Sequence, residues 1–206
     1  MDGAAVLVSG AGPVAAEMAR HGVRPRIIDM APERDGLSKA LGIQVRSLEL
    51  LERTGCVDAF LDAGEWSPRV TFHADRRTLG TVEVRGAGSR FDAALILAQC
   101  VTERLLEEHL GTFGVTVERR AELVSFEDAP GGVDCLLRHG DGTTEDVRAG
   151  WLVGADGARG RVRQTLGLPF DGVTEPGTFL PADAVMDWPL PADEIAIFWH
   201  RDGVMA

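Results

Sequence analysis

Short apolar runs alternate with a helical stretch at the start of the chain. The run at residues 4–8 is continuously apolar and ends at a serine and a glycine, and residues 26–29 form a second short stretch with two adjacent isoleucines. Such runs are typical of strands that are buried on both faces of a parallel sheet. Between them, Val14 to His21 follows a helical pattern that Gly22 would end. The pattern therefore predicts a strand, a helix and a second strand, which is the beginning of a βαβ unit.

Periodicity predicts the remaining elements in the same way. Helices are expected over residues 44–53, 57–63, 95–110 and 160–166. Short strands are expected within 70–91, with turns at Gly80 and at 86–88, and further strands near 115–118, 122–126, 133–138, 144–148 and 151–154. After Pro169 the chain becomes rich in proline and glycine, with strands near 184–187 and 195–199 and a return strand beginning at Val204. We expect an α/β fold with a domain change after residue 168.

Composition and charge narrow the class of protein. The chain has 206 residues, 45% hydrophobic residues and a net charge of −11. This hydrophobic content suits a globular protein. The negative net charge argues against nucleic acid as a partner, because phosphate backbones need a basic face. The three cysteines are scattered, which favours a reduced, cytoplasmic protein. No apolar run reaches the roughly 20 residues that span a bilayer, so no membrane partner is expected.

The first candidate site is the glycine-rich turn after the first strand, Gly10-Ala11-Gly12-Pro13-Val14-Ala15. Gly10 permits a tight turn, Gly12 lets backbone N–H groups approach a pyrophosphate, and the small Ala15 lets the helix pack on the strand. Pro13 suits the first helical turn. The alternative is an ordinary glycine turn of an α/β protein.

Asp29 strengthens the cofactor interpretation. It ends the second strand, 19 positions after Gly10 (29 − 10). An acid at about 20 residues from the first glycine accepts hydrogen bonds from a ribose hydroxyl. The alternative is a solvated aspartate at a strand end. The order of strand, glycines, helix, strand and acid favours a dinucleotide site.

A second turn between a strand and a helix carries Asp156 and Gly157, within Gly154-Ala155-Asp156-Gly157-Ala158-Arg159. The Asp156 carboxylate is a candidate acceptor for a ribose or ribityl hydroxyl. The alternative is an Asp-Gly turn that caps the following helix.

These motifs, taken in order, resemble the class A flavoprotein monooxygenases, typified by para-hydroxybenzoate hydroxylase and the polyketide and phenol hydroxylases. Gly10 to Pro13 is similar to their FAD motif, and Val153 to Arg159 is similar to the motif associated with both FAD and NAD(P)H. The stretch 41–49 places Arg46, and the stretch 97–99 places Gln99, where the family contacts the flavin.

The resemblance implies a Rossmann-like FAD-binding domain over residues 1–168, with a β insertion at about 70–91, and the start of a β-rich substrate domain over 169–206. It also implies hydroxylation of an aromatic or polyketide ring. FAD would be the cofactor, NAD(P)H the reductant and molecular oxygen the co-substrate. The named residues are cofactor-binding residues, and no catalytic acid or base is predicted. The five histidines show no metal-ligand spacing.

Three departures from the family pattern keep other functions open. The first helix is about four residues, or one turn, shorter than is usual. Gly160 stands where a serine is usual, and the family's later Gly-Asp-Ala segment has no counterpart. We therefore expect the isolated chain to be incomplete, with a partner chain as one source of the remainder. The alternatives are an NAD(P)-dependent dehydrogenase and a non-enzymatic or partner-requiring FAD-binding remnant.

Overall fold

The computed structural model divides the chain into two compact units. It describes residues 4–10, 13–36, 40–75, 77–84, 88–174, 177, 180, 182, 184, 187, 189–191 and 193–205. The first unit comprises Met1–Asp35 and Leu106–Phe179, and the second comprises Gly36–Leu105 and Leu180–Ala206.

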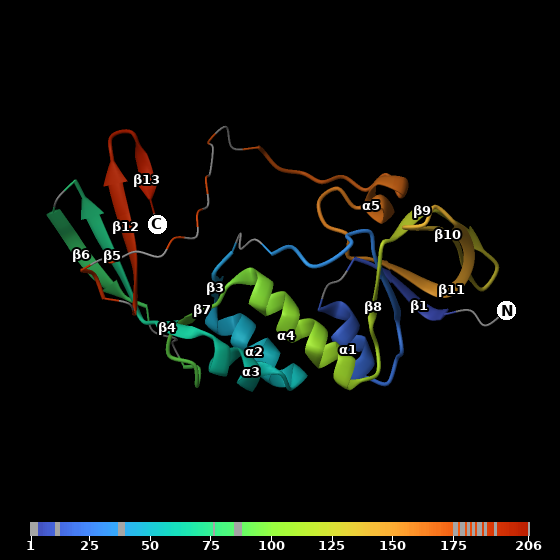
Figure 1. Ribbon diagram of the computed structural model, residues 1–206, viewed down its shortest axis with the longest axis horizontal. Coiled ribbons are helices and arrows are strands. Elements are labelled where there is room, and N and C mark those ends of the chain that lie inside the picture. The colour runs from blue at the N-terminus through green and yellow to red at the C-terminus, as the bar shows by residue number, and fades with distance from the viewer. Residues whose placement is uncertain are drawn as a thin grey trace. The chain divides into compact units, whose positions relative to one another are not determined.

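The first unit is built on a six-stranded sheet with the order β8-β2-β1-β11-β10-β9 (Figure 1). Its strands are β1 (Ala4–Ser9), β2 (Arg26–Asp29), β8 (Val117–Arg119), β9 (Ala121–Ala129), β10 (Gly132–His139) and β11 (Thr144–Gly154). The pairs among β8, β2, β1 and β11 are parallel, whereas β9, β10 and β11 form antiparallel hairpins. The sheet is therefore Rossmann-like at one side and a β-meander at the other.

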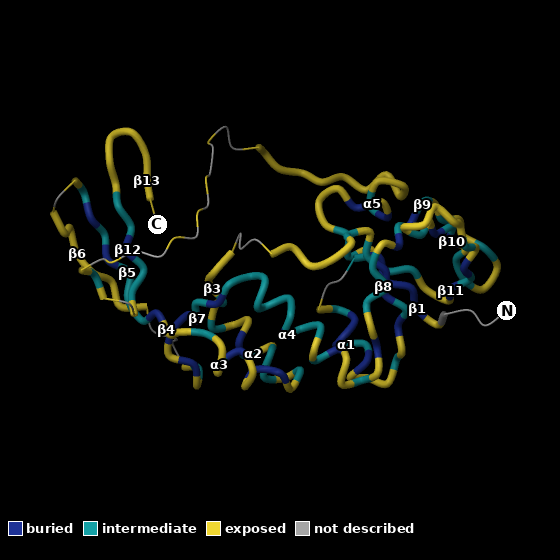
Figure 2. Tube along the Cα trace, in the orientation of Figure 1, coloured by how far each residue is buried: buried dark blue, intermediate teal, exposed yellow. Residues whose placement is uncertain are grey.

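Side chains of β1 alternate between two apolar cores. Val6 and Val8 pack with helix α1 (Val14–Arg20) and with Leu110 near the end of α4 (Gln99–Thr112). Leu7 packs on the other face with the β9–β11 side chains and with α5 (Arg161–Thr165). Figure 2 shows β1 as a buried strand within this unit. Burial on both faces is the reason that the run is continuously apolar.

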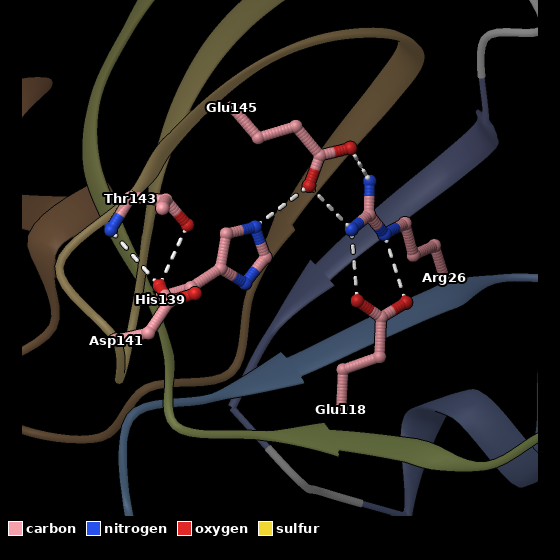
Figure 3. Close-up of polar contacts among 6 residues, drawn as sticks. All are labelled: Arg26, Glu118, His139, Asp141, Thr143 and Glu145. Carbon is pink, nitrogen blue, oxygen red and sulfur yellow. Dashed lines mark hydrogen bonds and ion pairs between the residues drawn. The ribbon is translucent and has the colours of Figure 1, made fainter.

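An ion network joins β2 to β8 and to β11 at one end of the sheet. The Arg26 guanidinium lies between two carboxylates, 2.8 Å from Glu118 on β8 and 2.7 Å from Glu145 on β11 (Figure 3). His139 Nε2 lies 2.9 Å from the same Glu145 carboxylate. Hydrogen bonds, chiefly from Arg26, lower the pKa of Glu145 to about 2. The network thus ties the β10–β11 hairpin to a strand with which it is not paired.

The second unit contains two further sheets. A three-stranded sheet has the order β3-β7-β4, and a four-stranded sheet has the order β13-β12-β5-β6. Their strands are β3 (Gly42–Ile43), β4 (Glu65–Ser67), β5 (Arg69–Ala74), β6 (Arg77–Glu83), β7 (Ala94–Ile96), β12 (Glu194–His200) and β13 (Gly203–Met205). Helices α2 (Val45–Thr54) and α3 (Val57–Ala63) contribute the fully buried Leu48 and Phe60.

The α/β fold class is confirmed, and the long-range pairing adds a feature that the sequence did not indicate. β5, in the expected β insertion, pairs in parallel with β12 over Arg69–Ala74 and Glu194–Trp199. The insertion and the strand near the end of the chain therefore share one sheet. The division of the chain into functional domains at residue 168 stays a prediction.

Three expectations about elements were wrong. The helix expected from residue 95 begins at Gln99, because the buried Leu95 belongs to β7 and pairs with β3 and β4. Gly80 is not a turn but lies within β6 opposite Phe72, and the chain reverses near Asp75, where φ is +52°.

The strands expected at 144–148 and 151–154 are one strand, β11. Gly150 lies within it, at a point where a Cβ would approach the Ala5 carbonyl of the neighbouring β1. Trp151 on this strand is exposed. The strand expected near residues 184–187 falls on a stretch that is only partly described.

Within the described part of the chain, no helix is both long enough and apolar enough to cross a membrane.

Candidate functional site

The turn after β1 admits only glycine at Gly10. Its φ is +102°, and a Cβ would collide with the carbonyl oxygen of Ala155. The Gly10 N–H donates to the Ile28 carbonyl at 2.9 Å, which holds the turn beside the end of β2. The backbone geometry at Gly10 therefore confirms the predicted tight turn. Gly12 lies outside the described residues.

Pro13 and Ala15 carry the chain from this turn into α1. Pro13 is the N-cap residue with φ −66°, already close to helical geometry. Ala15 is fully buried against the sheet, as the close packing of a helix on a strand requires. The helix ends at Arg20, and Gly22 follows with φ +80°.

The structure brings the second predicted turn against the first. The Ala155 N–H donates to the Ser9 carbonyl at 2.7 Å, and the Ser9 hydroxyl lies 3.5 Å from Asp156 Oδ2. Because β1 and β11 are parallel neighbours, both turns emerge at the same edge of the sheet. This edge, outside the carboxyl ends of parallel strands, is where α/β folds bind ligands.

Asp156 also caps α5, as the alternative interpretation predicted. Its Oδ2 accepts the backbone N–H of Arg161 at 2.7 Å. A Cβ at Gly160, the N-cap position, would collide with Asp156 Oδ1, so the carboxylate occupies the space that a serine side chain would need. Gly157 has φ +75° and makes the turn possible. Capping and cofactor binding do not exclude each other, since a carboxylate has about four acceptor sites.

Asp29 lies at the tip of β2 and is already held in place. Its Oδ1 accepts the Ala31 N–H at 2.8 Å, and its Oδ2 lies 3.3 Å from Arg119 Nη1. The side chain is 21% exposed, so it is neither sealed nor freely solvated. Asp29 is therefore not simply a solvated aspartate at a strand end.

A string of charges extends from Asp29 across the first unit. Arg119 donates to Glu107 at 3.0 Å, and Glu107 also accepts from Arg34 at 2.8 Å. Desolvation raises the pKa of Glu107, but the hydrogen bonds and charges of Arg34 and Arg119 outweigh it and leave that pKa below its usual value. The sequence pattern singled out neither Arg119 nor Glu107. Only the register of β8 beside β2 places Arg119 opposite Asp29.

Arg46 and Gln99 belong to the second unit. Arg46 is 72% exposed on α2 and pairs with Glu49 at 2.7 Å, which holds the pKa of Glu49 below its usual value. Gln99 begins α4 and donates to Glu103 at 2.8 Å. Each therefore has a local helix partner, and the contact of either residue with a flavin stays a prediction.

A groove of about 670 Å³ lies elsewhere on the first unit, beside the β-meander and α5. Its walls include Phe126, Trp151 and Leu166, and none of the predicted cofactor residues described by the structure lines it. Among the described residues there is also no cluster of His, Cys, Asp or Glu able to hold a metal ion.

Known proteins share this arrangement. Residues 3–203 match the family profile described as FAD binding domain. 6-Methylpretetramide 4-monooxygenase of Streptomyces rimosus is 37% identical over 198 residues, which make up 93% of this chain and 35% of that protein. Pentachlorophenol 4-monooxygenase of Sphingobium chlorophenolicum is 33% identical over 175 residues, 82% of this chain and 32% of that protein.

Solved structures agree with these relatives. Aklavinone-11 hydroxylase, solved in a ternary complex with FAD and aklavinone, superposes with a TM-score of 0.70 at 29% identity. The match covers 79% of this chain and 34% of the hydroxylase. This chain therefore spans about a third of the length of the curated relatives it matches. It belongs to the FAD binding domain family of the class A flavin-dependent monooxygenases, as its ordered motifs predicted.

Proposed function

We propose that this chain forms the FAD-binding part of a flavin-dependent monooxygenase that hydroxylates an aromatic or polyketide ring. The observation that carries the proposal is the meeting of the two turns, Ser9–Gly10 against Ala155–Asp156, at the carboxyl edge of a parallel sheet. In support of it, the chain is similar to monooxygenases whose names specify 6-methylpretetramide and pentachlorophenol. NAD(P)H is the proposed reductant and molecular oxygen the proposed co-substrate.

The described residues fit the adenosine half of FAD. At Gly10 the positive φ and the absence of a Cβ let the turn pack directly against Ala155, as the tight glycine turn of a dinucleotide site requires. Each oxygen of Asp29 accepts one hydrogen bond, which leaves about two of its four acceptor sites for ribose hydroxyls. We assign Gly10, Gly12, Pro13, Ala15 and Asp29 to the adenosine half.

We assign Asp156 and Gly157 to the second turn of the site, and Arg46 and Gln99 to the flavin half by resemblance to the family. When bound, FAD would supply the redox and oxygen chemistry of the reaction. The protein residues would bind and orient it. We also propose that a partner chain or a further domain covers the ring substrate. The proposed location is cytoplasmic.

Binding of FAD to the purified protein tests the proposal. We expect the protein to be yellow or to become so on reconstitution, and to quench FAD fluorescence on titration. FMN, which lacks the adenosine half, should bind more weakly than FAD. A protein that binds NAD(P)H but leaves the FAD spectrum unchanged would support the dehydrogenase alternative, and one that binds FAD without any NAD(P)H oxidation would support the non-enzymatic one.

A further inference from the structure

A ring of three contacts fixes the Asp29 carboxylate between the ends of β2 and β8. Asp29 Oδ1 accepts the Ala31 N–H at 2.8 Å, and the Ala31 carbonyl accepts the Arg120 N–H at 3.2 Å. Arg119 closes the ring by donating to Asp29 Oδ2 at 3.3 Å. Arg120 has φ +58°, a conformation that few residues other than glycine adopt, where the chain leaves β8. The Ala31 N–H thus donates to the carboxylate itself, and the Arg120 N–H holds Ala31 in place from the end of β8.

Arg119 is itself held in one orientation. It is the register partner of Asp29 in the parallel β2–β8 pair, and its side chain is only 20% exposed. Nη1 reaches Asp29, while Nη2 reaches Glu107 at 3.0 Å. A planar guanidinium with two anchored nitrogens has little freedom to rotate.

The charges of the four linked side chains cancel. Asp29 and Glu107 are two acids, and Arg119 and Arg34 are two bases, so the four side chains sum to zero. Removal of the Arg119 charge would leave two acids against one base, in a protein whose net charge is already −11. Asp29 would then lose the one side-chain partner that it has among the residues described by the structure.

We propose that Arg119 is a positioning residue for the cofactor: it holds the Asp29 carboxylate in the orientation that receives the adenosine ribose hydroxyls. This inference rests on the proposed function. An acceptor that is oriented before binding does not lose rotamer freedom when the ligand arrives, and affinity rises accordingly. Arg119 acts through Asp29 and is not assigned a contact with the cofactor.

The test compares Arg119→Gln with Arg138→Gln, a matched control. Arg138 pairs with Glu122 at 2.6 Å across the β9–β10 hairpin of the same unit. We expect Arg119→Gln to raise the Kd for FAD about tenfold, the effect of losing one oriented charge-assisted contact. Arg138→Gln should leave that Kd unchanged, and the Kd for FMN should be unaffected by either substitution.

A double-mutant cycle separates positioning from direct contact. In an Asp29→Asn background, Arg119→Gln should change the FAD affinity by less than about twofold, because its effect passes through the carboxylate. A full tenfold loss in that background would mean that Arg119 touches the cofactor itself, and would overturn the proposal. So would unchanged FAD affinity in Arg119→Gln alone.

Two further measurements keep the inference testable. If Arg119→Gln does not fold, Arg119→Lys should raise the Kd for FAD about threefold, because a single ammonium cannot reproduce the guanidinium fork. An unchanged Kd would then refute positioning.

In the protein without ligand, the amide proton resonance of Ala31 should shift in Arg119→Gln and not in Arg138→Gln. If the wild-type protein binds no FAD, the proposed function fails, and that resonance alone decides whether Arg119 orients Asp29.

Discussion

Asp29 keeps acceptor capacity at the tip of β2 although both of its oxygens already accept a hydrogen bond. We predict that Asp29→Ala weakens FAD binding by about 1.5–3 kcal/mol, the usual contribution of a hydrogen bond to a charged group. Calorimetric titration measures it. Asp128→Ala, which removes an exposed acid of β9 in the same unit, is the control. Equal affinities for wild type and Asp29→Ala would reduce Asp29 to a structural residue of the β2–β8 end.

Asp156 has two roles that a pair of substitutions can separate. Asp156→Ala removes the cap of the Arg161 N–H, so we predict a loss of about 1 kcal/mol in unfolding free energy together with weaker FAD binding. Asp156→Asn keeps an oxygen that can cap the helix but removes the charge. We expect it to retain stability and still bind FAD more weakly. Wild-type affinity in the folded Asp156→Asn protein would show that Asp156 only caps α5.

Among the elements, the attachment of the β10–β11 hairpin to β2 depends on pH. The pKa of Glu145 is about 2 in the folded protein, against an ordinary value of 4.5, chiefly because of Arg26. A depressed folded pKa stabilises the protein fully above the ordinary value, and this stabilisation is lost as the pH falls from about 4.5 towards 2. Since the side chain is 39% exposed, solvent screens part of the effect.

We predict that Glu145→Gln flattens the pH dependence of stability in that acid range while lowering stability at neutral pH. Thermal unfolding at a series of pH values measures both. Glu127→Gln, on the exposed side of β9, should follow the wild-type curve with pH. If Glu145→Gln also follows the wild-type curve, the Arg26 network contributes nothing to folding.

At the scale of the whole molecule, the four-stranded sheet exposes an apolar face. Trp199 stacks on Phe72 with ring centroids 5.5 Å apart and is 47% exposed, and Val82 and Val204 are more than half exposed. A shallow groove of about 290 Å³ opens between β5, β6 and β12 on this face. Figure 2 shows β6 and β13 exposed along their whole length. Such a surface does not exclude water by itself.

Oxygen transfer to a ring needs a pocket from which water is excluded. We therefore predict that the 206-residue protein, supplied with FAD, NAD(P)H and a panel of phenols, forms hydrogen peroxide rather than hydroxylated product. Both products are quantified in the same reaction, and free FAD without protein serves as the background. Hydroxylated phenol in a one-to-one ratio with NAD(P)H consumed, and little peroxide, would contradict the prediction.

The sequence by itself determined the local units of this protein. A continuous apolar run predicted β1, and the short stretch 26–29 predicted β2. The glycine turn and its distance to Asp29 predicted a dinucleotide site. These features are local, because a strand, a turn and a helix are specified by side-chain periodicity and by the conformational freedom of glycine. The ordered motifs were enough to identify the family.

Only the tertiary structure decided which of these units meet. Parallel pairing of β1 with β11 sets Asp156 beside Ser9, although 147 positions separate them in the chain. Pairing of β2 with β8 sets Arg119 beside Asp29, and pairing of β5 with β12 joins two distant segments in one sheet. Register between distant strands depends on packing across the whole unit, so local periodicity does not predict it. For the same reason the sequence pattern predicts Leu95 in a helix, whereas its pairing with β3 and β4 places it in a strand.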